Sequence, residues 1–338
     1  MISLSQREAG EFRPYLQRQG IEAHCYIVPG EGSALYFIRH LNYFIKFCRE
    51  QNVDYVFSHL DTPNFIASLG QYLIKARVFL CRHHVNEAEL YNYNLSWTYR
   101  LTNLLAKKII VVSSRSLEYM TRVEKVPPKK LIHINLAYDF SLYDIPSEKD
   151  TETIRSKFKT ELLLLTVCRL TKFKRPELSI QVVEKLKSQG IIANLIILGN
   201  GPIQQDLKDY VLKNKLENQI FILGHLSDVM KYIAAADLII HPSVLESSCV
   251  VIKEAALVNK PVVVCKGVGD FDDYMQNESN GFLVEQDDFV NSVIRIIHES
   301  RNEREKFYKI GNKLREDVCR LFDIRNVAKM YDFIKTKN

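Results

Sequence analysis

The stretch AADLIIHPSVLESSCVVIKEAALVNKPVVV, residues 235–264, carries the pattern that decides the fold. An apolar run at 237–240 leads into a polar loop, which is followed by a helical pattern over 248–258 and a second apolar run at 261–265. Short apolar runs on both sides of a helical segment are typical of a β-α-β unit with parallel strands. The stretch therefore predicts a parallel α/β layer.

The same alternation extends through the whole chain of 338 residues. In the first half it predicts strands at 22–28, 53–58, 77–82, 108–112 and 131–134, separated by helices at 5–19, 33–51, 63–75, 88–105 and 115–124. In the second half it predicts strands at 162–168, 194–198, 219–223, 237–240, 261–265 and 282–284, with helices at 176–189, 202–214, 227–235, 248–258 and 287–299 and two terminal helical stretches. Both halves are expected to be doubly wound parallel sheets.

A domain boundary is expected within residues 138–158, which lose the apolar periodicity and gather charged residues around Pro146. We therefore predict two Rossmann-like α/β domains, residues 1–150 and 151–321, with the C-terminal helix 322–338 completing the first. Ligands bind at the carboxyl ends of the strands in such sheets. A cleft faced by both domains is thus the expected place of function.

Composition excludes several classes of protein. The net charge of +6 is spread over both halves without a basic tail, so a nucleic-acid partner is not expected. Apolar runs fall far short of the ~20 residues that span a bilayer, and the first dozen residues lack the apolar segment of a secretory signal. Seven scattered cysteines indicate neither a disulfide framework nor a zinc site. A cytoplasmic protein is predicted.

Glu246 lies just before the helical pattern over 248–258, and Glu254 lies within it. Glu246 follows a strand and precedes Ser247 and Ser248, which are N-cap candidates for that helix. Free N–H groups at a helix start favour an anion such as a phosphate, and Glu254 lies roughly 12 Å further along, at ~1.5 Å per residue. The alternative is that Glu246 caps the helix and Glu254 is an ordinary surface residue.

Two other loops follow predicted strands of the second half. Arg169 and Lys174 lie on the first, where a guanidinium and an ammonium could bind phosphate oxygens. Gly199 and Gly201 lie on the second, where glycine permits close backbone approach to a ligand. Taken alone, the first loop could equally be a solvated charged turn. The second lacks the third glycine of a dinucleotide fingerprint, which argues against a dehydrogenase.

Together, CRLTKFKRPELSIQVVEKL, LIILGNGPIQQDL, AADLIIHPSVLESSCVVIKEAALVNKPVVV and NGFLV resemble the carboxyl-terminal domain of family-4-type retaining glycosyltransferases with the GT-B fold, the glycosyl transferases group 1. The resemblance is strong over residues 160–290 and weaker upstream. It implies an acceptor-side domain at 1–150 and a nucleotide-sugar donor domain at 151–321. It also implies that a sugar moves from a nucleotide-diphosphate sugar to an acceptor hydroxyl.

The resemblance also implies roles for single residues. Glu246 would hold hydroxyls of the transferred sugar and Glu254 those of the ribose, while Arg169 and Lys174 would neutralise the diphosphate. Fixed cations there would stabilise the leaving group without a metal. No cofactor is then expected, since the nucleotide sugar is a co-substrate.

Further residues match the family by position. A histidine near the sugar would be His83 or His84, although a lone histidine is more often structural. The residues expected to line the donor from the loops are Ser247, Ser248, Cys249, Val250, Gly267 and Gly269. Glycine at the last two could equally form an ordinary turn.

The sequence departs from the family in three places. Cys168 and Cys249 stand where relatives have glycine. Relatives also begin with a strand and a glycine-rich loop, whereas this chain is expected to open with a helix at about Ser5, so the first strand is expected to be missing, with only Gly10 nearby.

Three rival hypotheses remain open. Asp270-Phe271-Asp272 fits the D-x-D site of a metal-dependent single-domain transferase. A nucleotide-sugar epimerase would share the fold, and a non-catalytic binding protein would account for Cys249 and the absent strand. The favoured hypothesis is a retaining transferase of bacterial surface polysaccharide or glycolipid synthesis, with a saccharide or lipid-linked acceptor.

The aromatic and basic helix 33–51 is compatible with peripheral membrane contact, and packing on the first sheet is the alternative.

Overall fold

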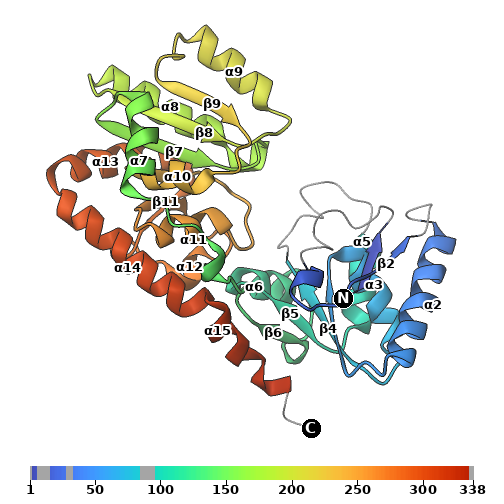
Figure 1. The fold of residues 1–338 in the computed structure, drawn as a ribbon. Helices are drawn as coiled ribbons and strands as arrows, with labels where there is room; N and C mark the ends of the chain where they lie inside the picture. Colours follow the sequence, from blue (N-terminus) through green and yellow to red (C-terminus); the bar gives the residue numbers. More distant parts are fainter. Residues whose placement is uncertain (1, 6–15, 28–32, 84–95, 335–338) are drawn as a thin grey trace. The chain divides into compact units, whose positions relative to one another are not determined.

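The computed structural model describes residues 2–5, 16–27, 33–83 and 96–334 (Figure 1). By its internal contacts the chain divides into unit 1, residues 1–111 and 116–133, and unit 2, residues 112–115 and 134–338. The predicted boundary lay near residue 150. The segment after 133 belongs to unit 2 because Ile154 and Phe158 pack in its core, which the polar composition of the segment concealed. Completion of the first domain by the C-terminal helix stays a prediction.

Unit 1 contains the five strands that the sequence predicts. Its elements are β1 (Ile2–Ser5), β2 (His24–Ile27), α2 (Ala34–Glu50), β3 (Tyr55–His59), α3 (Asp61–Gly70), β4 (Arg77–Arg82), α5 (Ser96–Leu105), β5 (Ile109–Val111), α6 (Ser114–Arg122), η1 (Pro128–Lys130) and β6 (Leu131–His133). Every pairing is parallel. The described hydrogen bonds divide the strands into a pair, β1-β2, and a four-stranded sheet in the order β3-β4-β5-β6.

The expectation that the first strand is missing is wrong. Residues 2–5 form β1, which pairs with β2 in the register Ile2↔His24 to Ser5↔Ile27. Ile2 and Leu4 alternate with serines, which is a strand pattern, but four residues were too few to outweigh the helical pattern expected from Ser5 onward. Most of that predicted helix, with Gly10, lies outside the described residues.

Unit 2 follows the predicted order of strands and helices. Its elements are η2 (Phe140–Leu142), α7 (Glu148–Arg155), η3 (Ser156–Phe158), β7 (Leu162–Val167), η4 (Lys172–Lys174), α8 (Pro176–Ser188), β8 (Ala193–Leu198), α9 (Gln204–Lys213), β9 (Ile220–Gly224), α10 (Val229–Ala235), β10 (Leu238–His241), α11 (Val250–Leu257), β11 (Val262–Cys265), α12 (Phe271–Tyr274), β12 (Phe282–Val284), η5 (Gln286–Asp288), α13 (Phe289–Asn302), α14 (Arg304–Phe322), α15 (Ile324–Val327) and η6 (Ala328–Ile334). The sheet order is β12-β11-β10-β7-β8-β9, which is the doubly wound order that we expected.

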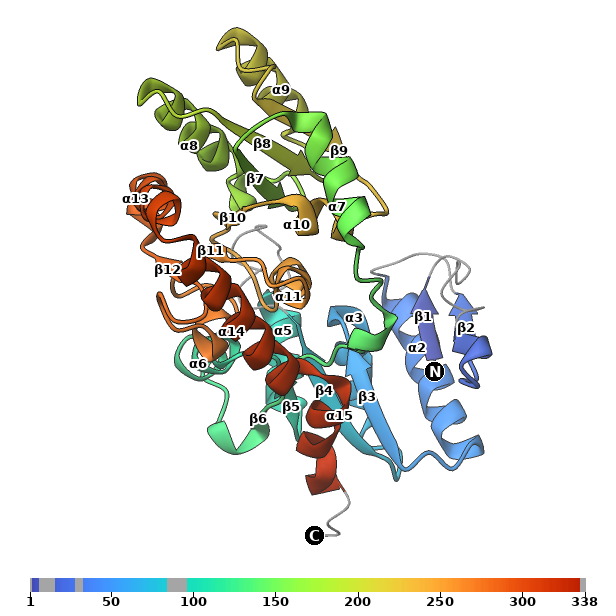
Figure 2. The ribbon, with the colours of Figure 1, turned by 60° about the vertical axis from the view of Figure 1, so that its left-hand side comes forward.

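The sheet of unit 2 is covered on both faces, which explains why its strands are continuous apolar runs. All six residues of β8 are buried, as are all four of β11. Helix α8 packs against β8 and α13, and α11 packs against α14 (Figure 2). This close packing gives the strand ends fixed positions, so the loops that follow them start from a rigid frame.

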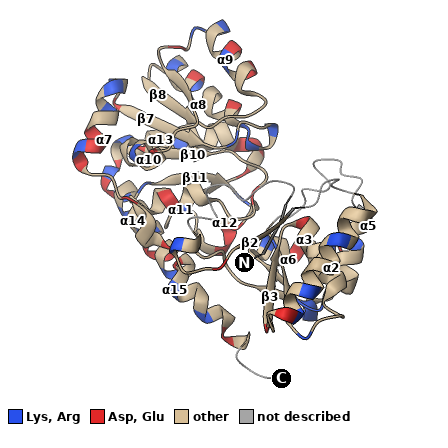
Figure 3. Ribbon diagram, turned by 45° about the vertical axis from the view of Figure 1, so that its right-hand side comes forward, with Lys and Arg blue, Asp and Glu red and all other residues tan. Residues whose placement is uncertain are grey.

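The long helix α14 is amphipathic. Its buried residues, Phe307, Ile310, Gly311, Leu314, Val318 and Phe322, recur every three or four positions and face the core. Most of the other positions of the helix carry charged residues of both signs (Figure 3). Exposed pairs such as Lys309 with Glu305, 2.8 Å apart, add little to stability, so the apolar stripe is what holds the helix.

Among the described residues, no helix is both long and apolar enough to cross a membrane. The helix α2, with its aromatic and basic residues, buries Tyr36, His40, Phe44 and Cys48 on one face. It therefore packs on unit 1 through that face, as the alternative reading of this segment has it.

Candidate active site

Polar side chains of unit 2 gather beyond the carboxyl ends of β7 and β10, which are neighbours in the middle of the sheet. The strand order reverses there. From β7 the sheet continues with β8 and β9, and from β10 it continues in the opposite direction with β11 and β12. Such a reversal leaves room for a ligand past the strand ends. The loops that follow the two strands carry Lys174 and Glu246, two of the predicted catalytic residues.

Glu246 and Lys174 meet as an ion pair that joins the two loops. Lys174 Nζ lies 2.5 Å from Glu246 Oε1 and also donates to the carbonyl oxygen of Leu245 at 3.0 Å. His241, the last residue of β10, lies with its Nε2 2.6 Å from the same Oε1. No described residue contacts Oε2 of Glu246 within hydrogen-bonding distance, so that oxygen can accept a bond from a ligand.

The charge state of Glu246 follows from these contacts. Burial alone would raise the pKa of its carboxyl, but the hydrogen bonds and charges of His241 and Lys174 outweigh burial and lower this pKa to about 2. Burial also disfavours a charged His241, whereas Cys249 and Glu246 beside it favour that form and raise its pKa to about 10. Glu246 is therefore a carboxylate at neutral pH, which suits an acceptor of hydroxyl hydrogen bonds and not a proton donor.

The predicted cations differ in their environment. Lys174 is largely buried beside Glu246, whereas Arg169 is exposed and has no ion-pair partner among the described residues. Arg175, which the sequence analysis did not single out, donates from Nε to the carbonyl oxygen of Pro242 at 2.9 Å and from Nη2 to Cys265 Sγ at 3.3 Å. Arg175 thus ties the β7 loop to the ends of β10 and β11, and Arg169 stays available for a phosphate.

Cys249 occupies the N-cap of α11, so the prediction that Ser247 or Ser248 caps this helix is wrong. The helix begins at Val250, and its cap residue makes no side-chain hydrogen bond to the helix. Cys249 is buried, with its sulfur 3.6 Å from His241 Nε2. The loop runs longer than expected because Ser248 has other partners, which are described below, and the first N–H groups of the helix are left for another acceptor.

The close approach at Gly199 and Gly201 is to the chain itself. A Cβ on Gly199 would lie 1.9 Å from the carbonyl oxygen of Cys168, and one on Gly201 would lie 2.2 Å from that of Leu170. These two loops also exchange backbone hydrogen bonds, from Cys168 N to Leu198 O and from Leu170 N to Asn200 O, both at 3.0 Å. The two glycines therefore position the Arg169 loop, and a role in contacting the donor stays a prediction.

The loop after β11 touches Glu246 directly. Gly269 has a φ of +59°, and a Cβ there would lie 2.7 Å from the Cβ of Glu246. Gly267 has a φ of +72°, and a Cβ there would meet nothing within 4 Å. Gly269 is thus needed for the packing of the two loops, while Gly267 leaves open space beside its backbone.

Glu254 lies on α11, half-buried, with no hydrogen bond or ion pair to any described residue. Burial raises the pKa of its carboxyl above the ordinary value. A partly desolvated carboxylate without a partner is a strong acceptor for hydroxyl groups. Its environment is compatible with the predicted ribose contact.

The D-x-D hypothesis finds no support in the geometry. Asp270 is buried and binds Lys253 and Ser248, whereas Asp272 Oδ2 accepts the backbone N–H of Gly267 at 2.7 Å. Two carboxylates of a D-x-D metal site would share an ion. Here each is bound to groups of the protein.

One group of side chains has the donor atoms of a metal site. Among the described residues, the ligand-type atoms of His241, Glu246 and Cys249 lie within 4.8 Å of one another. Lys174 binds the same oxygen of Glu246 at 2.5 Å, and an ammonium in that position opposes a second positive charge. The cluster is therefore better described as a hydrogen-bonded ion pair than as a metal site.

In unit 1 the predicted histidine His83 has a partner. It follows the end of β4, and its Nε2 lies 2.7 Å from Nδ1 of His59, the last residue of β3, with the two rings stacked at 5.0 Å. Burial lowers the pKa of His59. His84, the other predicted histidine, lies outside the described residues.

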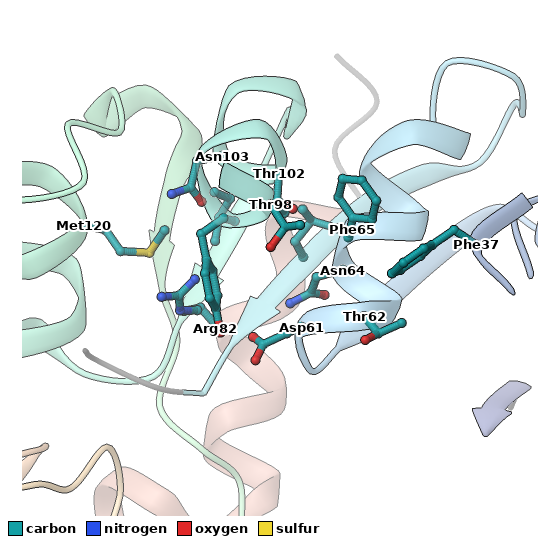
Figure 4. A pocket seen from close by; sticks show the side chains of 13 residues that line it. Phe37, Asp61, Thr62, Asn64, Phe65, Arg82, Thr98, Thr102, Asn103 and Met120 are labelled. Carbon is teal, nitrogen blue, oxygen red and sulfur yellow. The ribbon is translucent and has the colours of Figure 1, made fainter. Parts of the chain in front are cut away.

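Unit 1 also contains a small cavity of about 60 Å³ between α3, α5 and the sheet (Figure 4). Its walls include Phe37, Asp61, Asn64, Phe65 and Arg82. None of the predicted site residues that the structure describes lines this cavity. A few waters or a small substituent would fit in it, whereas a nucleotide sugar is far larger.

The sequence analysis did not single out His241, Arg175 and Lys253 of unit 2 as site residues, and it considered Asp270 only as part of a D-x-D site. Only His241 had a usable signal, because it ends a strand five residues before Glu246. Lysine within an apolar helix such as α11 reads as a surface residue from spacing alone. Its burial depends on packing that the sequence pattern does not describe.

Comparisons with known proteins find glycosyltransferases. Residues 148–314 match the family model of the glycosyl transferases group 1. A Campylobacter jejuni N-acetylgalactosamine-N,N'-diacetylbacillosaminyl-diphospho-undecaprenol 4-alpha-N-acetylgalactosaminyltransferase is 26% identical over 299 residues, which cover 86% of this chain and 76% of that protein. An N-acetyl-alpha-D-glucosaminyl L-malate synthase of Bacillus anthracis is 24% identical over 296 residues, covering 85% and 75%.

The fold has close structural neighbours. The crystal structure of Anabaena Alr3699/HepE in complex with UDP superposes with a TM-score of 0.81 at 20% identity, covering 96% of this chain and 89% of that one. At 20% identity the superposition is evidence for the fold alone. It confirms the expected GT-B architecture of two parallel-sheet α/β units. Residues 148–314, in unit 2, therefore belong to the glycosyl transferases group 1.

Proposed function

We propose that the protein is a retaining glycosyltransferase that moves a sugar from a nucleotide-diphosphate sugar to an acceptor hydroxyl. The anomeric carbon would lose its bond to the diphosphate oxygen and gain one to the acceptor oxygen, and the acceptor's proton would pass to the departing phosphate. Negative charge builds on the diphosphate in this step. The exposed guanidinium of Arg169 and the N-terminus of α11 are the groups of unit 2 suited to stabilise it.

One observation carries the proposal: Glu246, beyond the strand ends where the strand order reverses, has only one of its two carboxylate oxygens hydrogen-bonded to described residues. Both of its protein donors, His241 and Lys174, contact Oε1. The free Oε2 and the ionised state at neutral pH favour a hydroxyl-rich ligand, because a sugar supplies donors in the required number. Glu254, further along α11, supports a second set of hydroxyl contacts, as expected for the ribose.

The donor is tested by thermal shift. UDP, GDP, ADP and their sugars are added to the purified protein, with UDP first because the Anabaena structure holds it. A ligand at 100 times its dissociation constant stabilises the protein by about 2.7 kcal/mol. A melting temperature that moves with none of them would overturn the proposed donor site.

We also propose that transfer needs no metal ion. Fixed cations and a helix N-terminus can replace the ion at the leaving group, and the ammonium of Lys174, 2.5 Å from Glu246 Oε1, opposes a second positive charge beside His241. Transfer should proceed at an unchanged rate in excess EDTA. A rate that collapses with EDTA and returns with Mg²⁺ would contradict this part of the proposal.

The acceptor is proposed to be a saccharide or a lipid-linked saccharide of surface polysaccharide or glycolipid synthesis, reached by peripheral contact with the cytoplasmic membrane face. The relative from Campylobacter acts on a diphospho-undecaprenol substrate, by its name. Helix α2 exposes Leu35 and Ile38 beside Arg39, a combination suited to a membrane surface. Co-sedimentation with anionic vesicles at low salt tests the contact, and Leu35→Asp with Ile38→Asp should abolish it.

A further inference from the structure

Lys253 is a charged residue in the interior of unit 2. It lies on α11 next to Glu254, is 1% exposed, and places its Nζ 2.5 Å from Oδ2 of Asp270, which is also 1% exposed. Lysine is almost never fully buried unless it is paired. The proposed transfer chemistry uses neither of these two residues, so the pair calls for another explanation.

A third side chain completes the arrangement. Ser248 Oγ donates to Asp270 Oδ2 at 2.7 Å and accepts from Lys253 Nζ at 3.2 Å. The ammonium also lies over the rings of Tyr274 and Phe322, 4.7 Å and 4.5 Å from their centres. With the carboxylate, the hydroxyl and two aromatic faces around it, the ammonium of Lys253 has a single position.

The two partners of Lys253 belong to different loops. Ser248 lies in the loop after β10, residues 242–249, which carries Glu246. Asp270 ends the loop after β11, residues 266–270, which carries Gly267 and Gly269. These are the two loops whose residues were predicted to line the donor, and one buried ammonium fixes the distance between them.

We propose that Lys253 and Asp270 are positioning residues that hold these two loops at the separation needed to bind the nucleotide sugar, and that the pair sets the affinity for the donor. The inference rests on the proposed function. Lys253 does not reach the ligand itself, because its side chain is enclosed by protein. Its effect passes through Ser248 on one loop and Asp270 on the other, and the contact of Gly269 with Glu246 extends it to the predicted sugar site.

The test separates positioning from stability. Removing one member of a buried ion pair leaves an uncompensated charge and destabilises the fold, whereas removing both is often neutral. Lys253→Met and Asp270→Asn alone should therefore lower the melting temperature, and the double variant should regain most of it. The measurements are melting temperature, UDP affinity by calorimetry, and kcat and KM for the donor.

In the double variant we expect the loops to lose their tie while the fold persists. Its UDP affinity should fall about tenfold and its donor KM rise by a similar factor, with kcat within about threefold of wild type. Backbone amides of residues 243–249 and 266–270 should exchange faster with deuterium in the ligand-free protein. Lys309→Met with Glu305→Gln, which neutralises an exposed pair on α14, serves as the matched control and should change none of these.

The outcomes distinguish this inference from the function on which it rests. A stable double variant with wild-type UDP affinity and wild-type exchange in both loops would overturn the positioning role and leave the transferase proposal intact. A wild-type protein that binds no nucleotide would overturn the transferase proposal, and the donor role of the pair with it.

Discussion

Each unit contains a mostly buried glutamate paired with a cation, and the two differ in one respect. In unit 1, Glu124 uses both oxygens: Oε1 accepts from Arg82 at 2.9 Å and Oε2 from Asn103 at 2.6 Å. In unit 2, Glu246 takes both of its donors on Oε1. The side chains are similarly enclosed, 16% and 11% exposed, so burial does not distinguish them.

The number of hydrogen-bonded oxygens indicates whether each carboxylate is structural or available to a ligand. A buried charge in a structural pair is more stable when both carboxylate oxygens are hydrogen-bonded, as at Glu124, where Arg82 also stacks over the Tyr99 ring at 4.4 Å. A carboxylate that binds a ligand must keep an oxygen free. Glu246 keeps Oε2 free beyond the carboxyl ends of the strands, where a ligand is expected. Glu124 has both oxygens hydrogen-bonded.

The comparison predicts its largest effect at Glu246. Glu246→Gln should reduce the rate of sugar transfer by about 10²–10³, which is about 2.7–4 kcal/mol, because an amide there can neither balance Lys174 nor accept as strongly from a hydroxyl. The initial rate of transfer with a saturating donor measures this. Circular dichroism confirms that the fold is kept, and a variant with more than a third of wild-type activity would remove Glu246 from the site.

Glu124 should give the opposite result. Glu124→Gln leaves the buried guanidinium of Arg82 without its counter-charge, and we expect the free energy of unfolding to fall by about 3 kcal/mol while transfer changes less than twofold at a temperature where the variant is folded. Urea unfolding provides the measurement. Loss of transfer without loss of stability would mean that the two glutamates are not distinguished by their free oxygens.

The pH dependence of stability should reflect His241. The pKa of His241 is raised to about 10 in the folded protein, so its contribution is complete below its ordinary pKa near 6.5 and is lost as the pH rises toward 10. Glu246, with its pKa lowered to about 2, contributes above pH 4.5 and loses this only in acid. His241→Gln should therefore cost about 2 kcal/mol at pH 6, and less as the pH approaches 10.

Melting temperatures of wild type and His241→Gln, measured from pH 6 to pH 10, decide this prediction. The gap between the two curves should narrow with rising pH. A constant gap would show that the imidazole contributes by packing and hydrogen bonding alone, without gaining a proton.

Two arginines extend the comparison to the β7 loop. Arg169 is exposed and Arg175 is bound between two strand ends, so Arg169→Ala should lower kcat about tenfold, about 1.4 kcal/mol, with no change in melting temperature. Arg175→Ala should lower the melting temperature instead. Equal effects of both changes on stability would contradict the leaving-group role of Arg169.

The sequence predicted most of the fold because parallel sheets buried on both faces leave a strong apolar signal. Every strand of unit 2 was found within two residues of its predicted bounds, and the family motifs placed Glu246 and Lys174 together before their contact was known. The pattern failed where an element was short or its partners were distant. Strand β1 has four residues, and the segment 138–158 looks like a linker until Ile154 and Phe158 are seen in the core.

The order of the strands, the loops that bear charge and the E-x7-E pair of Glu246 and Glu254 follow from the sequence alone, because they depend on local periodicity and on spacing along the chain. Only the tertiary structure decided the partners of those charges: His241 on Glu246, the self-contacts of Gly199 and Gly201, and the burial of Lys253 against Asp270. The type of a side chain, and so its charge, is known from the sequence. How far that side chain is buried and which of its atoms are hydrogen-bonded depend on residues that are distant in the chain and close in the fold.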